Sequence, residues 1–367
     1  MHREDFEEIA HCGGQIIFDV SHGPNGERQL QLGMRHSRPN PSSVFVVYAI
    51  PQGVAIAYVP MGGIGVRLPA PPIPGAYMVF IASDSDGMFG HNCPDCEGYW
   101  RSAGAAHFCP YCGLQADQHQ FLSVAQQTYV AEYCERLSEA LSSDQPGQHV
   151  IDMDLVADAA GKNTEKPAFY YSEKSQQNKF TCTSCKNKMD ILGHYGYCSQ
   201  CGTRNDIQQL EKSIQQLREN ANNGAGLESC TKEIVGVFDS FVNQIAKQLL
   251  ARVPLTKARR HAIEKRSLHN LEAINRDFQE VFGISMLTGL SDEDVAFTKL
   301  MFYRRNVYEH NGGEADEAYI ASSGDTSVRL KQALRETKES FHRLASTIRK
   351  LGENLHRGFH EILPPSC

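Results

Sequence analysis

Eight of the 12 cysteines in the chain form four Cys-x-x-Cys pairs, and this pattern constrains the fold more than any other feature. The pairs fall into two sets, with 12 residues between the two pairs of each set. Every position of the first set recurs at the same offset in the second, as from Cys93 to Cys182, so one module is present twice. The first set is Cys93, Cys96, Cys109 and Cys112, and the second is Cys182, Cys185, Cys198 and Cys201.

This spacing predicts two metal sites. Two residues between cysteines allow one tight turn to direct both thiolates at one ion, and Gly113 and Gly202 give the backbone freedom that such turns need. Two turns together make the tetrahedral shell of four sulfurs that Zn(II) prefers in closed structural sites. A redox role is the alternative, but four thiolate ligands leave no open position. We therefore predict zinc ribbons at 89–116 and 178–204 and two structural Zn(II) ions per chain.

Composition and charge exclude several classes of protein. Hydrophobic residues make up 41% of the chain and charged residues 22%, as in soluble globular proteins. No apolar run reaches the roughly 20 residues that a membrane-spanning helix needs, so we predict a cytoplasmic protein without a membrane partner. The net charge of −7 argues against a globally basic nucleic-acid binder, although local basic patches are compatible with it.

The residues before the second ribbon read as a β domain followed by a connector. Short β-rich runs separated by turn sequences at 1–88 predict a small barrel or sandwich. It carries no catalytic constellation and is the candidate receptor for a protein or ligand trigger. For 117–177 we predict an amphipathic helix at 118–142 and then a polar connector. A linker helix at 205–226 ends in the Gly/Asn break at 222–226.

The region 227–367 reads entirely as helix. Apolar residues at helical spacing predict helices over 228–252 and 266–282, and Ser291 is placed to cap a third. A seven-residue apolar repeat predicts a long last helix over 326–358, which would also suit a dimer seam. The predicted fold class is therefore α+β and multidomain: a small N-terminal β domain, two four-cysteine zinc ribbons and a C-terminal all-α four-helix bundle.

Two groups of basic side chains are candidates for phosphate contacts. The first lies between two predicted helices and includes Lys257, Arg259 and Arg260. The second is the pair Lys186 and Lys188 in the second ribbon. Such residues bind phosphate in many proteins, but the same residues on solvated loops need no partner.

The third predicted helix ends in the sequence RNVYEH, which contains Arg305, Asn306 and His310. On one ideal helix Arg305 and His310 would lie about 140° apart, so they do not share a stripe. A bend near Gly312 or pairing with a second subunit would bring them together. The structural alternative is that Arg305 pairs with Glu309 at i, i+4 and that His310 lies at the surface after the helix.

A helical bundle with Arg-Asn-x-x-x-His after its third helix resembles the HEPN superfamily of endoribonucleases over 227–360. The resemblance implies an obligate homodimer in which two motifs face each other across the bundle interface. It also implies cleavage of RNA to a 2′,3′-cyclic phosphate end without a catalytic metal. Many HEPN proteins are toxins or act in antiphage defence.

The motif residues suit this chemistry. The RNA 2′-hydroxyl must lose a proton and the leaving oxygen must gain one, and His310 can act as general base or acid. Arg305 can hold phosphate oxygens with a bidentate fork, and Asn306 can orient the histidine or hold the phosphate. Arg304, Tyr308 and Glu309 are candidates for positioning substrate. The competing interpretation is a zinc-ribbon binding or scaffold protein with an inactive dimerisation bundle, and a partner of a nucleotide transferase is a third.

Overall fold

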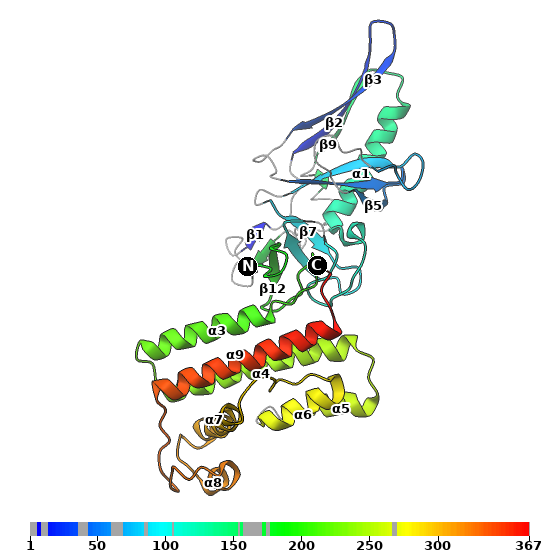
Figure 1. Ribbon diagram of the computed structural model, residues 1–367. Coiled ribbons are helices and arrows are strands. Elements are labelled where there is room, and N and C mark those ends of the chain that lie inside the picture. Colours follow the sequence, from blue (N-terminus) through cyan, green and yellow to red (C-terminus); the bar gives the residue numbers. More distant parts are fainter. Residues whose placement is uncertain are drawn as a thin grey trace. The chain divides into compact units, whose positions relative to one another are not determined.

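The computed structural model describes ten stretches of the chain and divides it into two compact units. The first unit is Met1–Thr203 with Ser366–Cys367, and the second is Arg204–Pro365 (Figure 1). Among the described residues, no helix combines the length and apolar content needed to cross a membrane. The described residues are 6–8, 14–35, 43–59, 69–83, 87–104, 106–152, 155–156, 171–173, 177–265 and 270–366.

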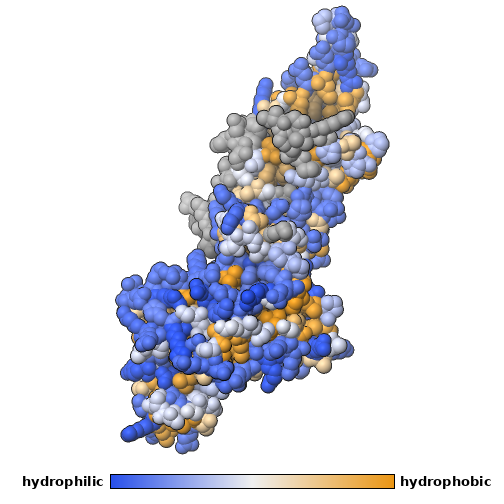
Figure 2. Space-filling model, viewed as in Figure 1, coloured by the Kyte–Doolittle hydropathy of each residue, from blue (hydrophilic) through white to orange (hydrophobic). Residues whose placement is uncertain are grey.

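Two three-stranded antiparallel sheets and one helix share a hydrophobic core in the first unit, which confirms the predicted N-terminal β sheets. The sheets have the orders β3-β2-β9 and β5-β4-β6. Phe18, Val47 and Val79 come from three different strands and are all fully buried. The tip of the β2–β3 hairpin is hydrophilic in Figure 2. The strands are β2 (Gln15–His22), β3 (Arg28–Arg35), β4 (Val44–Ala49), β5 (Ala55–Val59), β6 (Tyr77–Ala82) and β9 (Gly147–Asp152).

Helix α1 (Val124–Ser142) covers this core. It begins six residues later than predicted, because Ser123 and Gln126 form a capping box in which each side chain accepts the other residue's backbone N–H. The residues Gln118–Phe121 form one turn of 3-10 helix instead. Tyr129 and Tyr133 are the large side chains that α1 buries between the sheets.

The predicted polar connector contributes a strand to the first sheet. Strand β9 pairs antiparallel with β2, with Ile151 opposite Ile16. Further along, β10 (Tyr171–Glu173) pairs with β1 (Phe6–Glu8). The connector residues 157–170 lie outside the described residues. The β domain is therefore completed by residues that follow the first ribbon.

The two ribbons contribute a separate four-stranded antiparallel sheet with the order β11-β12-β8-β7. One face of this sheet packs in a small core around Trp100, Met189 and Ile191. The strands are β7 (Phe89–Asn92), β8 (Tyr99–Ser102), β11 (Gln177–Thr181) and β12 (Lys188–Leu192).

The regular elements described in the second unit are helices, and α4 is its central helix, packed against α3, α7 and α9. The helix predicted at 228–252 corresponds to α4. The predicted linker helix corresponds to α3, which packs on α4 and α9 within this unit. Figure 2 shows mainly hydrophilic residues on the outward face of α3. The helices are α3 (Asp206–Asn222), α4 (Leu227–Arg252), α5 (Lys257–Glu264), α6 (Leu271–Phe282), α7 (Asp292–His310), α8 (Glu317–Ser323) and α9 (Lys338–Ile362).

The last predicted helix is partly wrong. Helix α9 starts only at Lys338, where Thr337 and Ser340 form a capping box, and it continues to Ile362. Leu330 and Leu334, the first members of the apolar repeat, therefore lie in non-helical chain. The short helix α8 was not predicted. The helix expected at 266–282 begins at Leu271 and is preceded by the separate helix α5.

Candidate functional site

All four Cys-x-x-Cys turns have the same backbone structure. In each turn the residue after the second cysteine has a positive φ, between 58° and 77°. Its N–H donates a hydrogen bond to the carbonyl oxygen of the first cysteine. The sequence indicated this conformation at the two glycines only, since the other two positions hold larger residues that adopt it at some cost. The four residues are Glu97, Gly113, Lys186 and Gly202.

These turns gather the eight thiols into two compact groups. In the first group the Sγ atoms of Cys93 and Cys112 are 3.7 Å apart, and in the second those of Cys182 and Cys201 are also 3.7 Å apart. The ligand atoms of each group lie within 4.8 Å of one another. Tetrahedral Zn–S bonds of about 2.3 Å place sulfurs roughly 3.8 Å apart, so the donor set fits such an ion. Each four-cysteine group can hold a metal ion.

The two ribbons pair around a local twofold axis. Strands β8 and β12 are antiparallel, and Arg101 lies directly opposite Asp190, one repeat of 89 residues further on. Reciprocal bonds between the second turns support the relation: Phe108 N–H donates to Ser199 O, and Tyr197 N–H donates to Pro110 O, both at 2.9 Å. The donor and the acceptor of the second bond are the repeat equivalents of those of the first, so each ribbon makes the same bond to the other. The duplication therefore builds a dimer of ribbons within one chain.

One contact departs from this symmetry. Ala103 N–H donates directly to Lys188 O at 3.0 Å. At the equivalent place the Tyr111 hydroxyl lies between the strands, where it accepts from Leu192 N–H at 3.1 Å and donates to Tyr99 O at 2.5 Å. The two ribbons are thus closely but not perfectly equivalent.

The residues on the axis form a buried ion pair. Arg101 Nη2 lies 2.7 Å from Asp190 Oδ2, with side chains only 2% and 4% exposed. In an identical dimer the residue on the axis would face its own copy and bring like charges together. Duplication within one chain removes that constraint, because the two copies can carry opposite charges.

Helix α7 carries the predicted catalytic motif without interruption. Ser291 caps it by accepting the N–H of Asp294, and the helix continues to His310, so a bend near Gly312 would lie after the motif and would not bring Arg305 and His310 together. Arg305 is half-buried, and its Nη1 donates to Asn306 Oδ1 at 3.2 Å. His310 is exposed at the end of the helix. Within one chain Arg305 and His310 therefore keep the helical separation of about 140°.

Arg304 and Tyr308 have internal partners. Arg304 pairs with Asp325 at 3.0 Å and with Glu336 at 3.1 Å, and the Tyr308 hydroxyl donates to Glu336 at 2.7 Å. The Tyr319 hydroxyl donates to Asp325 at 2.6 Å. This network holds the chain between α8 and α9 against α7. Its two carboxylates gave no sequence signal, because their partners are distant in sequence.

The other predicted substrate contacts lie at the surface. Glu309 pairs with Lys232 of α4 at 3.5 Å. Lys257, Arg259 and Arg260 are exposed on α5, where Arg260 donates to Leu250 O at 2.7 Å. Contact between these residues and a substrate stays a prediction.

Acid is expected to weaken the second unit through Asp325. Burial acts to raise the pKa of this carboxyl, but hydrogen bonds from Ser327, Tyr319 and Arg304 outweigh it and hold the pKa well below its ordinary value. A lowered pKa gives stability that is complete above about pH 5 and is lost as the pH falls below about 4. Urea midpoints followed by far-UV circular dichroism should fall between pH 6 and pH 3.

The matched control is Asp325→Asn, which cannot titrate at this position. Its midpoint should be lower at pH 6 and should change less between the two pH values. An equal acid effect in both proteins would show that other carboxyl groups are responsible.

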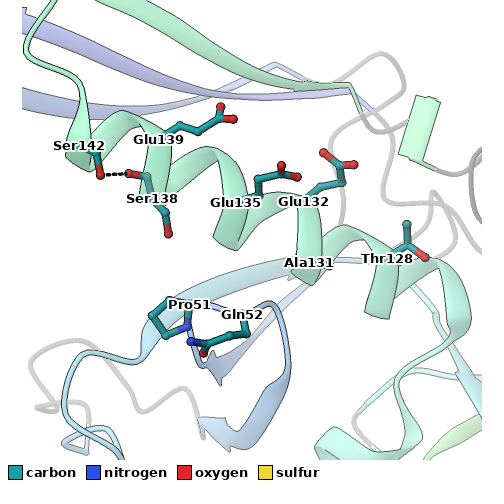
Figure 3. A pocket seen from close by; sticks show the side chains of 9 residues that line it. All are labelled: Pro51, Gln52, Thr128, Ala131, Glu132, Glu135, Ser138, Glu139 and Ser142. Carbon is teal, nitrogen blue, oxygen red and sulfur yellow. Dashed lines mark hydrogen bonds between the residues drawn. The ribbon is translucent and has the colours of Figure 1, made fainter.

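One groove in the first unit is acidic. It has a volume of about 680 Å³ and lies between α1 and the β4–β5 turn, where Pro51 and Gln52 face the helix (Figure 3). Three glutamates of α1 line it: Glu132, Glu135 and Glu139. Arg136 is committed to ion pairs with two of them. This groove repels phosphate and is not a candidate for nucleic-acid binding.

Comparisons with known proteins leave the family open. No protein-family model matches the chain, and no significant match was found among curated proteins or solved structures. The resemblance to HEPN proteins therefore rests on the motif of α7 and on its helical surroundings.

Proposed function

We propose that the protein is a metal-independent endoribonuclease whose active site is formed by α7 of two copies in a homodimer. The observation that carries this proposal is the hydrogen bond from Arg305 to Asn306. It holds the guanidinium beside a residue that lies one helical turn before His310 and shares its face. Two such faces brought together would place two arginines and two histidines around one phosphate.

The chemistry follows from the side chains. One His310 takes the proton from the 2′-hydroxyl, whose oxygen forms a bond to phosphorus. The bond from phosphorus to the 5′ oxygen breaks, and His310 of the second copy protonates that oxygen. Arg305 stays charged and stabilises the oxygens of the crowded phosphate as negative charge builds up on them. The products are a 2′,3′-cyclic phosphate and a 5′-hydroxyl.

The two four-cysteine groups fit structural zinc, and we include two Zn(II) ions per chain in the proposal. Closed sites of four sulfurs leave no position for substrate, so zinc serves the fold and not the cleavage step. We propose that the protein acts as a cytoplasmic toxin or antiphage effector and that its N-terminal β domain is the receptor for the trigger.

The test is cleavage of a labelled single-stranded RNA by the zinc-loaded protein. We expect a cyclic-phosphate product, and His310→Ala and Arg305→Ala should each lose about a hundredfold or more in rate. His22→Ala and Arg276→Ala change exposed residues that are not part of the motif and should retain the rate. EDTA should leave the rate unchanged as long as metal analysis shows that the protein has kept its zinc.

Full activity in His310→Ala would overturn the proposal. The subunit arrangement has a separate check, since sedimentation should find a dimer that dissociates in parallel with loss of activity.

The alternative function is a zinc-ribbon binding or scaffold protein with an inactive bundle. The observation that favours it is the separation of Arg305 and His310 on one uninterrupted helix. A stable dimer that cuts none of the RNAs offered, with the two motifs far apart, would support this alternative.

A further inference from the structure

The second cysteine turns of the two ribbons are bonded directly to each other. Ser199 follows Cys198 inside its turn, and its carbonyl oxygen accepts the N–H of Phe108 at 2.9 Å. Phe108 directly precedes Cys109 of the first group. The bond related to this one by the local axis joins the same two turns in the opposite direction. A cysteine of each group therefore stands next to a residue that the other group's turn holds in place.

The second ribbon also completes the core around the first group. Cys93 and Cys109 are buried in one cluster with Met189 and Ile191 of the second ribbon. Met189 in turn accepts a hydrogen bond from the Ser199 hydroxyl at 3.0 Å, and Ser199 lies within a turn of the second group. The packing of the first group thus depends on a side chain that the second group positions.

The first ribbon makes a matching contact with the second group. A Cβ at Gly202, the residue after Cys201, would lie 3.2 Å from the ring of Phe108. Glycine therefore permits this close approach as well as the positive φ of the turn. The buried pair of Arg101 and Asp190 adds a charge contact between β8 and β12. Each ribbon supplies part of the surroundings of the other ribbon's cysteines.

These contacts form only when both ribbons are folded, and the folding of such a small unit depends on its ion. A structural metal site is not preformed in the unfolded chain, so metal binding and folding occur together. The ion that binds first orders its own ribbon without a folded neighbour. The second ion then binds to a ribbon whose neighbour already presents its bonds and its core. By linkage, the gain in affinity is the same whichever site is filled first.

We propose that the two four-cysteine sites bind their ions cooperatively, so that a chain holds either two ions or none. The choice of Zn(II) as the ion rests on the zinc included in the proposed function. The coupling does not depend on ribonuclease activity, since all of its contacts lie within the first unit. Its consequence is that a chelator that takes one ion also weakens the binding of the other.

The experiment equilibrates the reduced, metal-free full chain with zinc buffers and counts the ions on each chain by native mass spectrometry. When empty and fully loaded chains are equally abundant, two independent sites leave about one half or more of the chains with a single ion. A coupling of about 100-fold between two similar sites, within the range common for linked sites, lowers this share to about one tenth. The two groups have the same turns and similar sulfur geometry, so we expect a share near the lower figure.

Arg101→Met is the variant that uncouples the sites. Paired ribbons would then bury the Asp190 carboxylate without its partner, whereas separate ribbons leave it in water. The variant should still bind two ions, but the share of chains with a single ion should rise to about one half or more. Arg136→Met is the matched control, because it makes the same substitution in α1, which supplies no cysteine to either group. It should keep the distribution of the unmodified chain.

Each possible failure has its own signature. A single-ion share of about one half or more in the unmodified chain, or an unchanged low share in Arg101→Met, would overturn the coupling through the ribbon interface. Two ions bound independently would leave the zinc assignment standing, and a chain that binds no zinc would overturn both. The cleavage of RNA is measured separately and bears on neither result.

Discussion

Removal of metal is expected to unfold the ribbon sheet while the helices of the second unit persist. The core of that sheet is small, so the two four-sulfur groups supply much of its stability, and structural zinc contributes about 10–16 kcal/mol of apparent binding energy in comparable small sites. Trp100 is the single tryptophan of the chain and is 1% exposed. A strong chelator should therefore shift its fluorescence to the red, whereas the helical circular dichroism should change little.

Single cysteine variants sharpen this prediction. Cys198→Ser should bind one ion per chain instead of two, and its Trp100 fluorescence should respond to milder chelation. Cys134→Ser is the control, because Cys134 is equally buried but lies in α1, away from both groups. Two ions in Cys198→Ser, or native fluorescence after complete metal removal, would contradict the assignment of the sites.

Replacement of Arg101, the arginine on the local twofold axis, is expected to give the second large loss of stability. Arg101→Met leaves the buried carboxylate of Asp190 without its partner, and such a change costs about 3–5 kcal/mol. Urea unfolding followed by Trp100 fluorescence should report this loss directly. Arg136→Met removes an arginine that is 39% exposed and should cost less than about 1 kcal/mol.

The local symmetry makes a sharper test available. Exchanging the charges in the double variant Arg101→Asp/Asp190→Arg should recover part of the lost stability, because the axis relates the two positions, although the arginine at position 190 would then lie opposite Lys179. An exchange of residues of such different length is rarely tolerated at unrelated positions. If the double variant is as unstable as Arg101→Met, the surroundings of the two residues are not equivalent.

The sequence predicted local features well. Cysteine spacing located both four-cysteine groups, and apolar periodicity located α4, because each signal lies within a short stretch of chain. The residues before α9 were predicted to be helical because their leucines fit the seven-residue apolar repeat. Their conformation depends instead on Arg304, which binds Asp325 and Glu336 from a helix at least 21 residues away. No local pattern encodes that contact.

The pairing of the ribbons was missed for a related reason. The repeat was visible in the sequence, but the twofold relation depends on the register of β8 against β12 and on one ion pair. Strand β9 was likewise assigned to a connector, since its polar residues match no strong strand pattern until Ile151 is placed opposite Ile16. For the motif of α7, the residues were identified, and their catalytic role stays a prediction.

The interleaved order of the strands has a consequence for synthesis on the ribosome. Strand β8 pairs with β12, whose residues emerge 87 positions later at the opposed pair Ser102 and Met189, and β2 pairs with β9 across a still longer stretch. Both sheets have high contact order, since the β3-β2-β9 sheet cannot close before Asp152 has been made and the ribbon sheet cannot close before Leu192 has been made. Until then the edge of β8 and the charge of Arg101 are open to other chains. The first unit is therefore the slow-folding part of the molecule and the part that depends most on protection while it is being made.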